Sequence, residues 1–283
     1  MSNFKISVIV TLFNKSKYIR RALLSVIHQT YDNLEIIVID DASTDDSFAV
    51  ARLASCNDAR FVFISNETNL GQAKTLNVGI SQCTGNIIAF LDADFFWSLD
   101  HLEKVVSKFN EHPNSGLVYS HIINHRYKKI EGIRPYKEIL SNGFLCSTSC
   151  ISVDTIKFRD IGCFPITFAV DDEACFMMGK SFEIRLIDEE TVVYAKNPDS
   201  LTNNSLTVCS YKLDLLDKYK YDIFEYCGKS VYASHLYRLS YLAFSFSHFG
   251  FGLRCLARAV LMHIDLRELF RLTAKTILLL IRR

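Results

Sequence analysis

The chain has 283 residues, of which 49% are hydrophobic and 22% are charged, and its formal net charge is +1. This length and apolar content suit one large domain with a small appendage and exclude global disorder. The near-zero net charge argues against a nucleic-acid-binding protein, so we expect no nucleic-acid partner.

Nine cysteines are scattered along the chain without a CxxC pair. Their odd number and irregular spacing argue against a disulfide scaffold or a zinc ribbon and favour buried thiols in a reducing compartment. The N-terminus lacks the apolar stretch of a signal peptide, and no apolar run approaches the roughly 18 to 20 residues of a membrane-spanning helix. We therefore expect a cytoplasmic protein.

Apolar strand-like runs and helical periodicities alternate along the first hundred residues. Strands are expected at residues 5–10, 34–39, 61–64 and 86–91, and helices at 17–29, 41–55, 71–82 and 99–110. Four such units predict an α/β fold with a mostly parallel sheet covered by helices on both faces. Ligands of these sheets bind beyond the carboxyl ends of the strands.

The second half is less regular. We expect strands at 116–122 and 148–153, a polar and basic loop at 124–143, a helical run at 174–179, a turn at 196–200, and mainly helices from about residue 208. The pattern therefore predicts an α/β domain over residues 1–205, which would hold the ligand site, and a helical C-terminal extension over residues 206–283.

Two carboxylates follow the fourth predicted strand, at Asp92 and Asp94. Residues two apart on an extended chain point the same way, so both side chains could face one ion. Mg²⁺ and Mn²⁺ typically bind one or two carboxylates together with substrate phosphates. An Asp-rich turn that caps the next helix is the alternative, and this short pattern leaves both interpretations open.

Two further acidic segments have the same ambiguity. Asp40 and Asp41 follow the second predicted strand, where one of them could cap the next helix or accept a hydrogen bond from a nucleotide base. Asp171 and Asp172 precede a helical run, where acids are favoured by the helix dipole or could include a general base.

Five motifs in chain order closely resemble those of family-two glycosyltransferases. Any one of them is weak, but their order and spacing are specific, and together they span about residues 6–200. They are residues 6–15 (ISVIVTLFNK), 22–45 with Asp40-Asp41, 69–79 with Asn69-Leu-Gly71, 84–94 with Asp92-Ala-Asp94, and Gly162-Cys-Phe164 followed by Asp171-Asp172.

The resemblance implies a GT-A fold and an inverting transfer of a sugar to a hydroxyl of a saccharide or lipid-linked acceptor. The donor would be a UDP-sugar or another nucleotide diphosphate sugar, and the cofactor Mn²⁺ or Mg²⁺. Asp172 would be the catalytic base and Asp171 a supporting or acceptor-binding acid. The remaining site residues would be Thr11, Asn14, Asp41, Lys74 and Asp92 at the nucleotide, and Asp92 and Asp94 at the metal.

Three positions depart from the family pattern, namely Leu76, Phe95 and Asn197. These departures leave open the interpretation that the protein binds a sugar nucleotide with little or no turnover. Lys74 could also be a solvated helix residue instead of a nucleotide contact. A nucleotidyltransferase is a further alternative. It would normally carry a glycine-rich loop after the first strand, whereas residues 11–14 contain no glycine.

The last 33 residues carry seven basic and two acidic side chains. Arg267, Arg271 and Lys275 share one helical stripe opposite Leu269 and Leu272. A basic amphipathic helix can lie on an anionic membrane, which predicts a peripheral position on the inner face of the cell membrane. Packing of the same helix on its own domain is the alternative.

Overall fold

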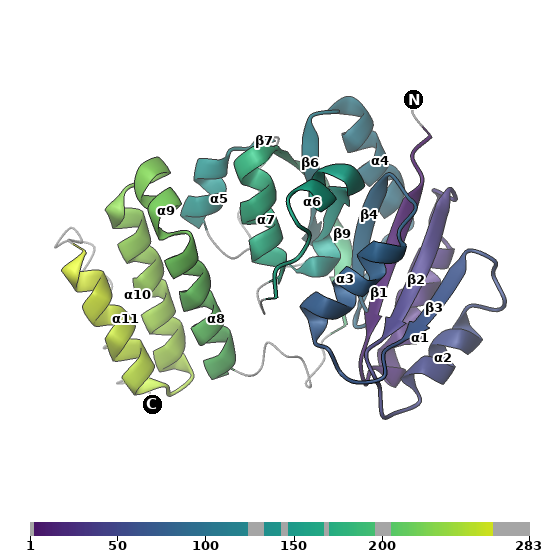
Figure 1. Ribbon diagram of the computed structural model, residues 1–283, viewed down its shortest axis with the longest axis horizontal. Helices are drawn as coiled ribbons and strands as arrows, with labels where there is room; N and C mark the ends of the chain where they lie inside the picture. Colours follow the sequence, from purple (N-terminus) through teal and green to yellow (C-terminus); the bar gives the residue numbers. More distant parts are fainter. Residues whose placement is uncertain (1–2, 124–132, 143–146, 167–169, 196–204, 263–283) are drawn as a thin grey trace. The chain divides into compact units, whose positions relative to one another are not determined.

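The computed structural model describes residues 3–123, 133–142, 147–166, 170–195 and 205–262. The chain divides into two compact units (Figure 1), Met1–Pro135 with Phe144–Asn197, and Tyr136–Gly143 with Pro198–Arg283. The assignment of a catalytic domain to residues 1–205 and an extension to 206–283 stays a prediction.

One mixed sheet forms the centre of the first unit. Its strand order within the described residues is β3-β2-β1-β4-β8-β6-β9-β5, and β7 pairs with β9. The first four strands in this order are parallel, and β8 runs antiparallel to both β4 and β6. This confirms the expected α/β fold. The strands are β1 (Ile6–Leu12), β2 (Leu34–Asp40), β3 (Phe61–Ser65), β4 (Ile87–Asp92), β5 (Phe95–Trp97), β6 (Ser115–Ile122), β7 (Ile133–Arg134), β8 (Ile151–Asp154) and β9 (Glu183–Tyr194).

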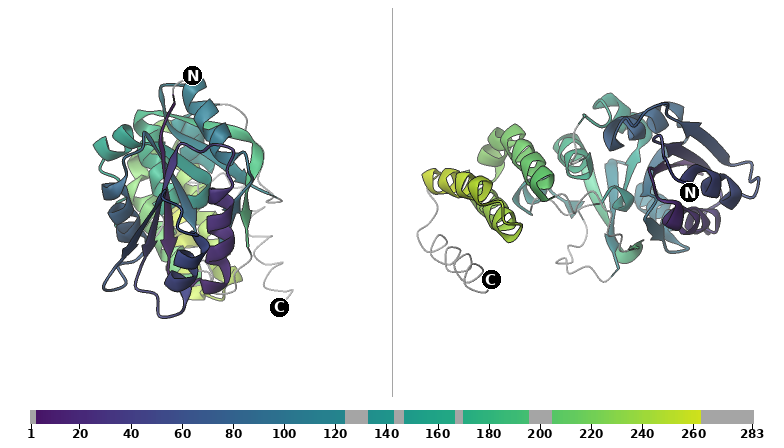
Figure 2. Two further views of the ribbon diagram at one scale, coloured as in Figure 1. Left: turned by 90° about the vertical axis from the view of Figure 1, so that its right-hand side faces the viewer. Right: turned by 90° about the horizontal axis from the view of Figure 1, so that it is seen from below.

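Helices cover both faces of the sheet (Figures 1 and 2). On one face the Leu102 N–H of α4 donates to Gln29 Oε1, just past the end of α1, at 2.9 Å. On the other face Arg159 of α6 donates to the Ile80 carbonyl of α3 at 2.7 Å. The helices are α1 (Ser16–Ile27), α2 (Ser47–Ala54) and α4 (His101–Glu111) on the first face, and α3 (Gln72–Gln82), α6 (Thr155–Asp160) and α7 (Val170–Ser181) on the second.

Apolar burial explains why these segments form helix and strand. In α1 the buried side chains Ile19, Ala22, Leu23 and Val26 recur at helical spacing and form one face. In β1 Ile6, Val8, Ile9 and Val10 are all completely buried, as expected for a central strand covered on both faces. Burying each such Val, Leu or Ile side chain contributes about 1.5–3 kcal/mol.

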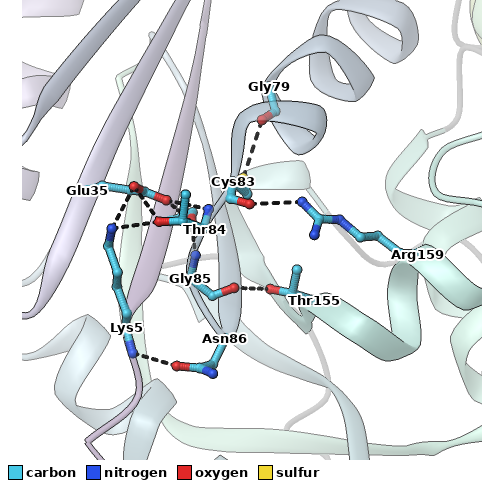
Figure 3. Close-up of polar contacts among 10 residues, drawn as sticks. Lys5, Glu35, Gly79, Cys83, Thr84, Gly85, Asn86, Thr155 and Arg159 are labelled. Carbon is cyan, nitrogen blue, oxygen red and sulfur yellow. Dashed lines mark hydrogen bonds and ion pairs between the residues drawn. The ribbon is translucent and has the colours of Figure 1, made fainter.

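A polar cluster closes the sheet at the amino ends of β1, β2 and β4, which we call the amino edge (Figure 3). Glu35 accepts hydrogen bonds there from the Lys5 ammonium at 2.8 Å and from the Thr84 N–H at 2.7 Å. A Cβ on Gly85 would lie 2.7 Å from the Lys5 carbonyl oxygen and from the Ser7 nitrogen. Only glycine fits this close approach of two backbone segments.

The second unit is helical. Tyr136 of α5 donates to Asp222 of α9 at 2.6 Å, and Arg258 of α11 forms an ion pair with Asp217 of α8. No helix in the described part of the chain has both the length and the apolar character to cross a membrane. The helices are α5 (Tyr136–Asn142), α8 (Ser205–Lys218), α9 (Lys220–Tyr226), α10 (Lys229–Ser245) and α11 (Phe249–Leu261).

Several expected elements need correction. The loop predicted at 124–143 is wrong over α5, because Ile139 and Leu140 are buried and stabilise a helix within a polar, basic sequence. The strand predicted at 148–153 begins as a 3₁₀ helix, Thr148–Cys150, and the helix predicted to open in the segment 41–45 begins at Ser47. The turn at 196–200 and the basic stripe at 267–275 lie outside the described residues.

Candidate active site

The carboxyl ends of β2, β1 and β4 meet at one edge of the sheet, which we call the carboxyl edge. In the strand register Leu12 pairs with Asp40 and Thr11 pairs with Asp92. The strand order reverses here, because β2 and β3 lie on one side of β1 and β4 lies on the other. Open α/β sheets bind their ligands at such a switch point.

Asp41 follows β2 and organises the segment that leads into α3. Its Oδ1 accepts from Asn66 Nδ2 at 2.9 Å and from the Leu70 N–H at 2.8 Å, and its Oδ2 accepts from the Gly71 N–H at 3.0 Å. Gly71 has a φ of +80°, which favours glycine. Since a carboxylate has about four acceptor positions, Asp41 keeps capacity for one further donor.

Asn14 fastens the loop after β1 to the loop after β2. Its Oδ1 accepts from the Thr44 N–H at 2.8 Å, and its own N–H donates to Ser43 Oγ at 3.0 Å. Its φ of +51° lies in the left-handed region, which asparagine tolerates better than most residues. Asn14 therefore lies at the carboxyl edge, and its contact with the nucleotide stays a prediction.

Asp92 accepts hydrogen bonds from side chains of several segments. Its Oδ1 accepts from Thr11 Oγ1 at 3.3 Å and from Gln72 Nε2 at 3.2 Å. Its Oδ2 accepts from Ser149 Oγ at 3.3 Å, and the same hydroxyl accepts from the Asp92 N–H at 2.9 Å. Three segments of the chain, at Thr11, Gln72 and Ser149, therefore hold this one carboxylate.

Negative charge at the carboxyl edge shifts the pKa of its acids. Burial and the charges of Asp94 and Asp171 together raise the pKa of Asp92 to about 7, although the hydrogen bonds from Ser149 and Thr11 oppose the shift. Burial also raises the pKa of the Cys150 thiol, with a contribution from the charges of Asp171 and Asp92. The first turn of α7 therefore lies close enough to the end of β4 for their acids to repel each other.

Asp94 lies in a turn between β4 and β5, so the alternation expected of an extended chain does not apply to it. Its carboxylate instead forms an ion pair with the Lys15 ammonium, with 3.1 Å between Nζ and Oδ2. The Ala195 N–H fixes the turn by donating to the Asp94 carbonyl at 2.9 Å. A cavity of about 330 Å³ opens beside it, lined by Lys17, Tyr18, Arg21, Asp94, Phe95 and Phe96 among others.

Asp171 and Asp172 lie in the first turn of α7, where the helix dipole favours acids. The Asp171 carboxylate accepts from the Asp172 N–H at 3.0 Å. Asp172 is buried, while Asp171 is partly exposed. The structure thus brings the Asp171 charge to Asp92, and the predicted division of roles between the two acids stays a prediction.

Sequence reasoning missed three polar residues that hold Asp92 or its neighbours, namely Gln72, Thr148 and Ser149. Gln72 donates to both Asp92 and Thr148, at 3.2 and 3.3 Å. Its place directly after Gly71, in the first turn of α3, was the one available signal. Lys74 is exposed two positions further along the chain, on α3, and its nucleotide contact remains a prediction.

The acids of the carboxyl edge fit a divalent cation that relies on its substrate for further ligands. Within the described residues no three His, Cys, Asp or Glu side chains form a complete metal cluster. Mg²⁺ and Mn²⁺ commonly take one or two carboxylates and complete their shell with phosphates and water. The raised pKa of Asp92 marks charge that such a cation would neutralise.

Known proteins with similar sequences are glycosyltransferases. The glycosyltransferase GlyA of Streptococcus pneumoniae is 35% identical over 138 residues, covering 44% of this chain and 19% of GlyA. The Escherichia coli WfgD, a UDP-Glc:α-D-GlcNAc-diphosphoundecaprenol β-1,3-glucosyltransferase, is 31% identical over 160 residues, covering 54% of this chain and 60% of WfgD. The match thus spans less than two thirds of either relative.

Solved structures with a similar fold include two nucleotide-sugar complexes. Staphylococcus aureus TarS with UDP-GlcNAc has a TM-score of 0.65 at 21% identity, covering 86% of this chain and 73% of that one. The mannosyltransferase PcManGT of Pyrobaculum calidifontis, in complex with GDP-Man and Mn²⁺, has a TM-score of 0.69 at 17% identity, covering 98% and 81%. Both likenesses support the GT-A fold.

A family model described as glycosyl transferase family 2 matches residues 7–164, which is more than half of the chain. The matched range includes β1 from Ser7 onward, the Asp40–Asp41 pair, Gly71 and the Asp92–Asp94 turn, and so contains most of the carboxyl edge. The chain therefore belongs to glycosyl transferase family 2.

Proposed function

We propose that this enzyme transfers a sugar from a UDP-sugar to a hydroxyl of a saccharide or lipid-linked acceptor, with inversion at the transferred carbon. The observation that carries the proposal is the meeting of acids from β2, β4 and α7 around one edge of the sheet. Inverting transfer needs a base for the acceptor proton on one side of the sugar and neutralisation of the departing diphosphate on the other.

In this proposal the nucleoside lies against Thr11, Asn14 and Asp41. The remaining acceptor capacity of Asp41 suits the N–H of a uracil base. Two similar proteins also favour a UDP donor for this chain. The name of WfgD includes UDP-Glc, and TarS was solved in complex with UDP-GlcNAc. PcManGT is in complex with GDP-Man, so a GDP-sugar is the alternative donor. Assays with a panel of nucleotide sugars would distinguish the two donors.

Asp92 and Asp94 would hold Mn²⁺ or Mg²⁺, and the ion bound to PcManGT makes Mn²⁺ the first to test. When bound, this cation neutralises the charge that develops on the leaving diphosphate. The chain itself orients Asp92 through Thr11, Gln72 and Ser149. The Asp172 carboxylate takes the proton of the acceptor hydroxyl as that oxygen attacks the sugar.

The acceptor is proposed from WfgD, whose name states a diphosphoundecaprenol-linked sugar. An acceptor on a lipid would suit peripheral contact between the helical second unit and a membrane. Leu253, Val260 and Leu261 of α11 are 58%, 46% and 78% exposed, next to the exposed Arg254, as an interfacial helix requires. Deleting residues 266–283 should then weaken binding to anionic liposomes, and unchanged binding would favour packing on the protein itself.

Asp172→Asn tests the proposed chemistry. Turnover of UDP-sugar should fall by about 10³-fold, because a general base commonly contributes 10²- to 10⁴-fold. Binding of UDP, measured calorimetrically with Mn²⁺, should persist because Asp172 does not hold the nucleotide. If turnover survives, the base is another residue. If the wild type binds UDP but turns over no sugar in a donor panel, the chain is a binding module.

A further inference from the structure

Lys15 forms an ion pair inside the proposed metal site. Its ammonium lies 3.1 Å from Asp94 Oδ2, and only 19% of the Lys15 side chain and 10% of the Asp94 side chain are exposed. An ion pair with so little exposure is screened weakly by solvent, and losing one partner leaves a buried charge uncompensated. The carboxylate that the metal would use is thus already neutralised by the chain itself.

The backbone on either side of Lys15 is fixed. Its N–H donates to Ser47 Oγ at 2.7 Å, and the next N–H, from Ser16, donates to Asp45 Oδ2 at 3.2 Å. Lysine carries its charge on a flexible four-carbon stem with three donors. The ammonium can therefore change partner by side-chain rotation while the loop stays in place.

We propose that Lys15 is the counter-ion of Asp94 until a divalent cation binds. The cation then takes the place of the Lys15 ammonium at the Asp94 carboxylate, and the released ammonium binds the diphosphate of the nucleotide sugar. The inference rests on the metal-dependent function proposed above. An ammonium and a divalent cation repel each other and compete for the same carboxylate oxygen, so binding of the cation releases Lys15.

The diphosphate is the nearest new partner for the released ammonium. Ligands that share one divalent cation lie within about 4 Å of each other, so a phosphate oxygen on the ion falls within reach of the same side chain. The cavity beside Asp94 adds the positive charges of Lys17 and Arg21. Lysine is a common phosphate-binding residue as a point charge.

The exchange of partners by Lys15 couples binding of the divalent cation to binding of the nucleotide diphosphate. The metal alone binds weakly, because it must break the ion pair between Lys15 and Asp94 without replacing it. The diphosphate restores a partner for Lys15, so metal and nucleotide strengthen each other. Coupling of this kind commonly amounts to 5- to 150-fold in affinity.

Titration calorimetry of Mn²⁺ alone, UDP alone and UDP with saturating Mn²⁺ tests the proposal. In Lys15→Met, Mn²⁺ alone should bind about tenfold more tightly and UDP with Mn²⁺ about tenfold more weakly than in the wild type. Arg20→Met removes one charge from an exposed position of α1, the helix that begins directly after Lys15, and should leave all three affinities unchanged. Lys15→Arg, which keeps the charge, should retain part of the coupling.

Two failures can be told apart. If the wild type shows coupled binding of Mn²⁺ and UDP and Lys15→Met shows the same affinities within twofold, the role of Lys15 is refuted while the proposed function stands. If neither the wild type nor any variant binds Mn²⁺, with or without UDP, the metal-dependent function is refuted, and the proposed role of Lys15 is refuted with it. A thermal unfolding curve for each variant confirms that it is folded.

Discussion

At the amino edge of the sheet Glu35 accepts hydrogen bonds from Lys5, Ser7 and Thr84, whereas at the carboxyl edge Asp92 faces the charges of two other acids. Burial alone would raise the pKa of Glu35, but these hydrogen bonds outweigh it and lower the pKa to about 2. Burial and the charges of Asp94 and Asp171 raise the pKa of Asp92 to about 7.

The same side-chain chemistry therefore serves two purposes in one sheet. The amino edge satisfies its acid within the protein, which stabilises the native state. The carboxyl edge leaves negative charge that the protein compensates only in part, which costs stability and prepares the site for cationic or donor-rich ligands. Stability and function are thus separated between the two ends of the same strands.

Asp92→Asn should produce the largest effect and the sharpest contrast. Turnover should fall by about 10²- to 10³-fold, the size expected when one preorganised electrostatic group is lost from an active site. The free energy of unfolding should rise by about 1 kcal/mol, because the repulsion with Asp94 and Asp171 is relieved. Steady-state kinetics and urea unfolding measure the two effects. A drop in stability would mean that Asp92 is structural like Glu35.

Gly85→Ala should break the amino edge. The added Cβ would lie 2.7 Å from backbone atoms of residues 5 and 7, which cannot yield as a flexible side chain would. We expect a loss of about 3 kcal/mol in the free energy of unfolding. UDP affinity of the folded fraction should not change, since the carboxyl edge is at the other end of the strands. Gly250→Ala is the matched control, because a Cβ there meets open space.

Glu35→Gln should cost about 2 kcal/mol at pH 7, after allowance for partial exposure of the cluster. Because the folded pKa is depressed, the stabilisation by Glu35 is fully present above its ordinary pKa of 4.5 and is lost as the pH falls through about 2. The stability difference between wild type and variant should therefore shrink between pH 4.5 and pH 2. Urea unfolding at several pH values measures it, and a constant difference would contradict the account.

Much of the first unit follows from sequence patterns because its information is local. The apolar runs of β1, β2 and β4 predicted buried strands, and the rule for carboxyl ends led to Thr11, Asp41 and Asp92. No pattern predicted β5, which has three residues and pairs with β9 nearly a hundred residues later. Such short strands depend on tertiary pairing.

The inner contacts of the site were equally beyond local reasoning. Ser149 reaches Asp92 across 57 positions, and Lys15 lies far from Asp94 in the sequence but meets it because β1 and β4 are neighbours in the sheet. Their residue types are ordinary, so only the folded register brings them together. The two acids after residue 170 were recognisable by their resemblance to a family motif, while their proximity to Asp92 required the structure.

A crystal of the protein with UDP and Mn²⁺, measured at a wavelength where manganese scatters anomalously, tests the central proposal most directly. We expect the anomalous peak between Asp94 and the diphosphate, the uracil ring against Asp41, and Asp172 on the open side of the site. A manganese peak away from Asp92 and Asp94, or a nucleotide bound elsewhere on the first unit, would contradict a single site built from the three acidic segments.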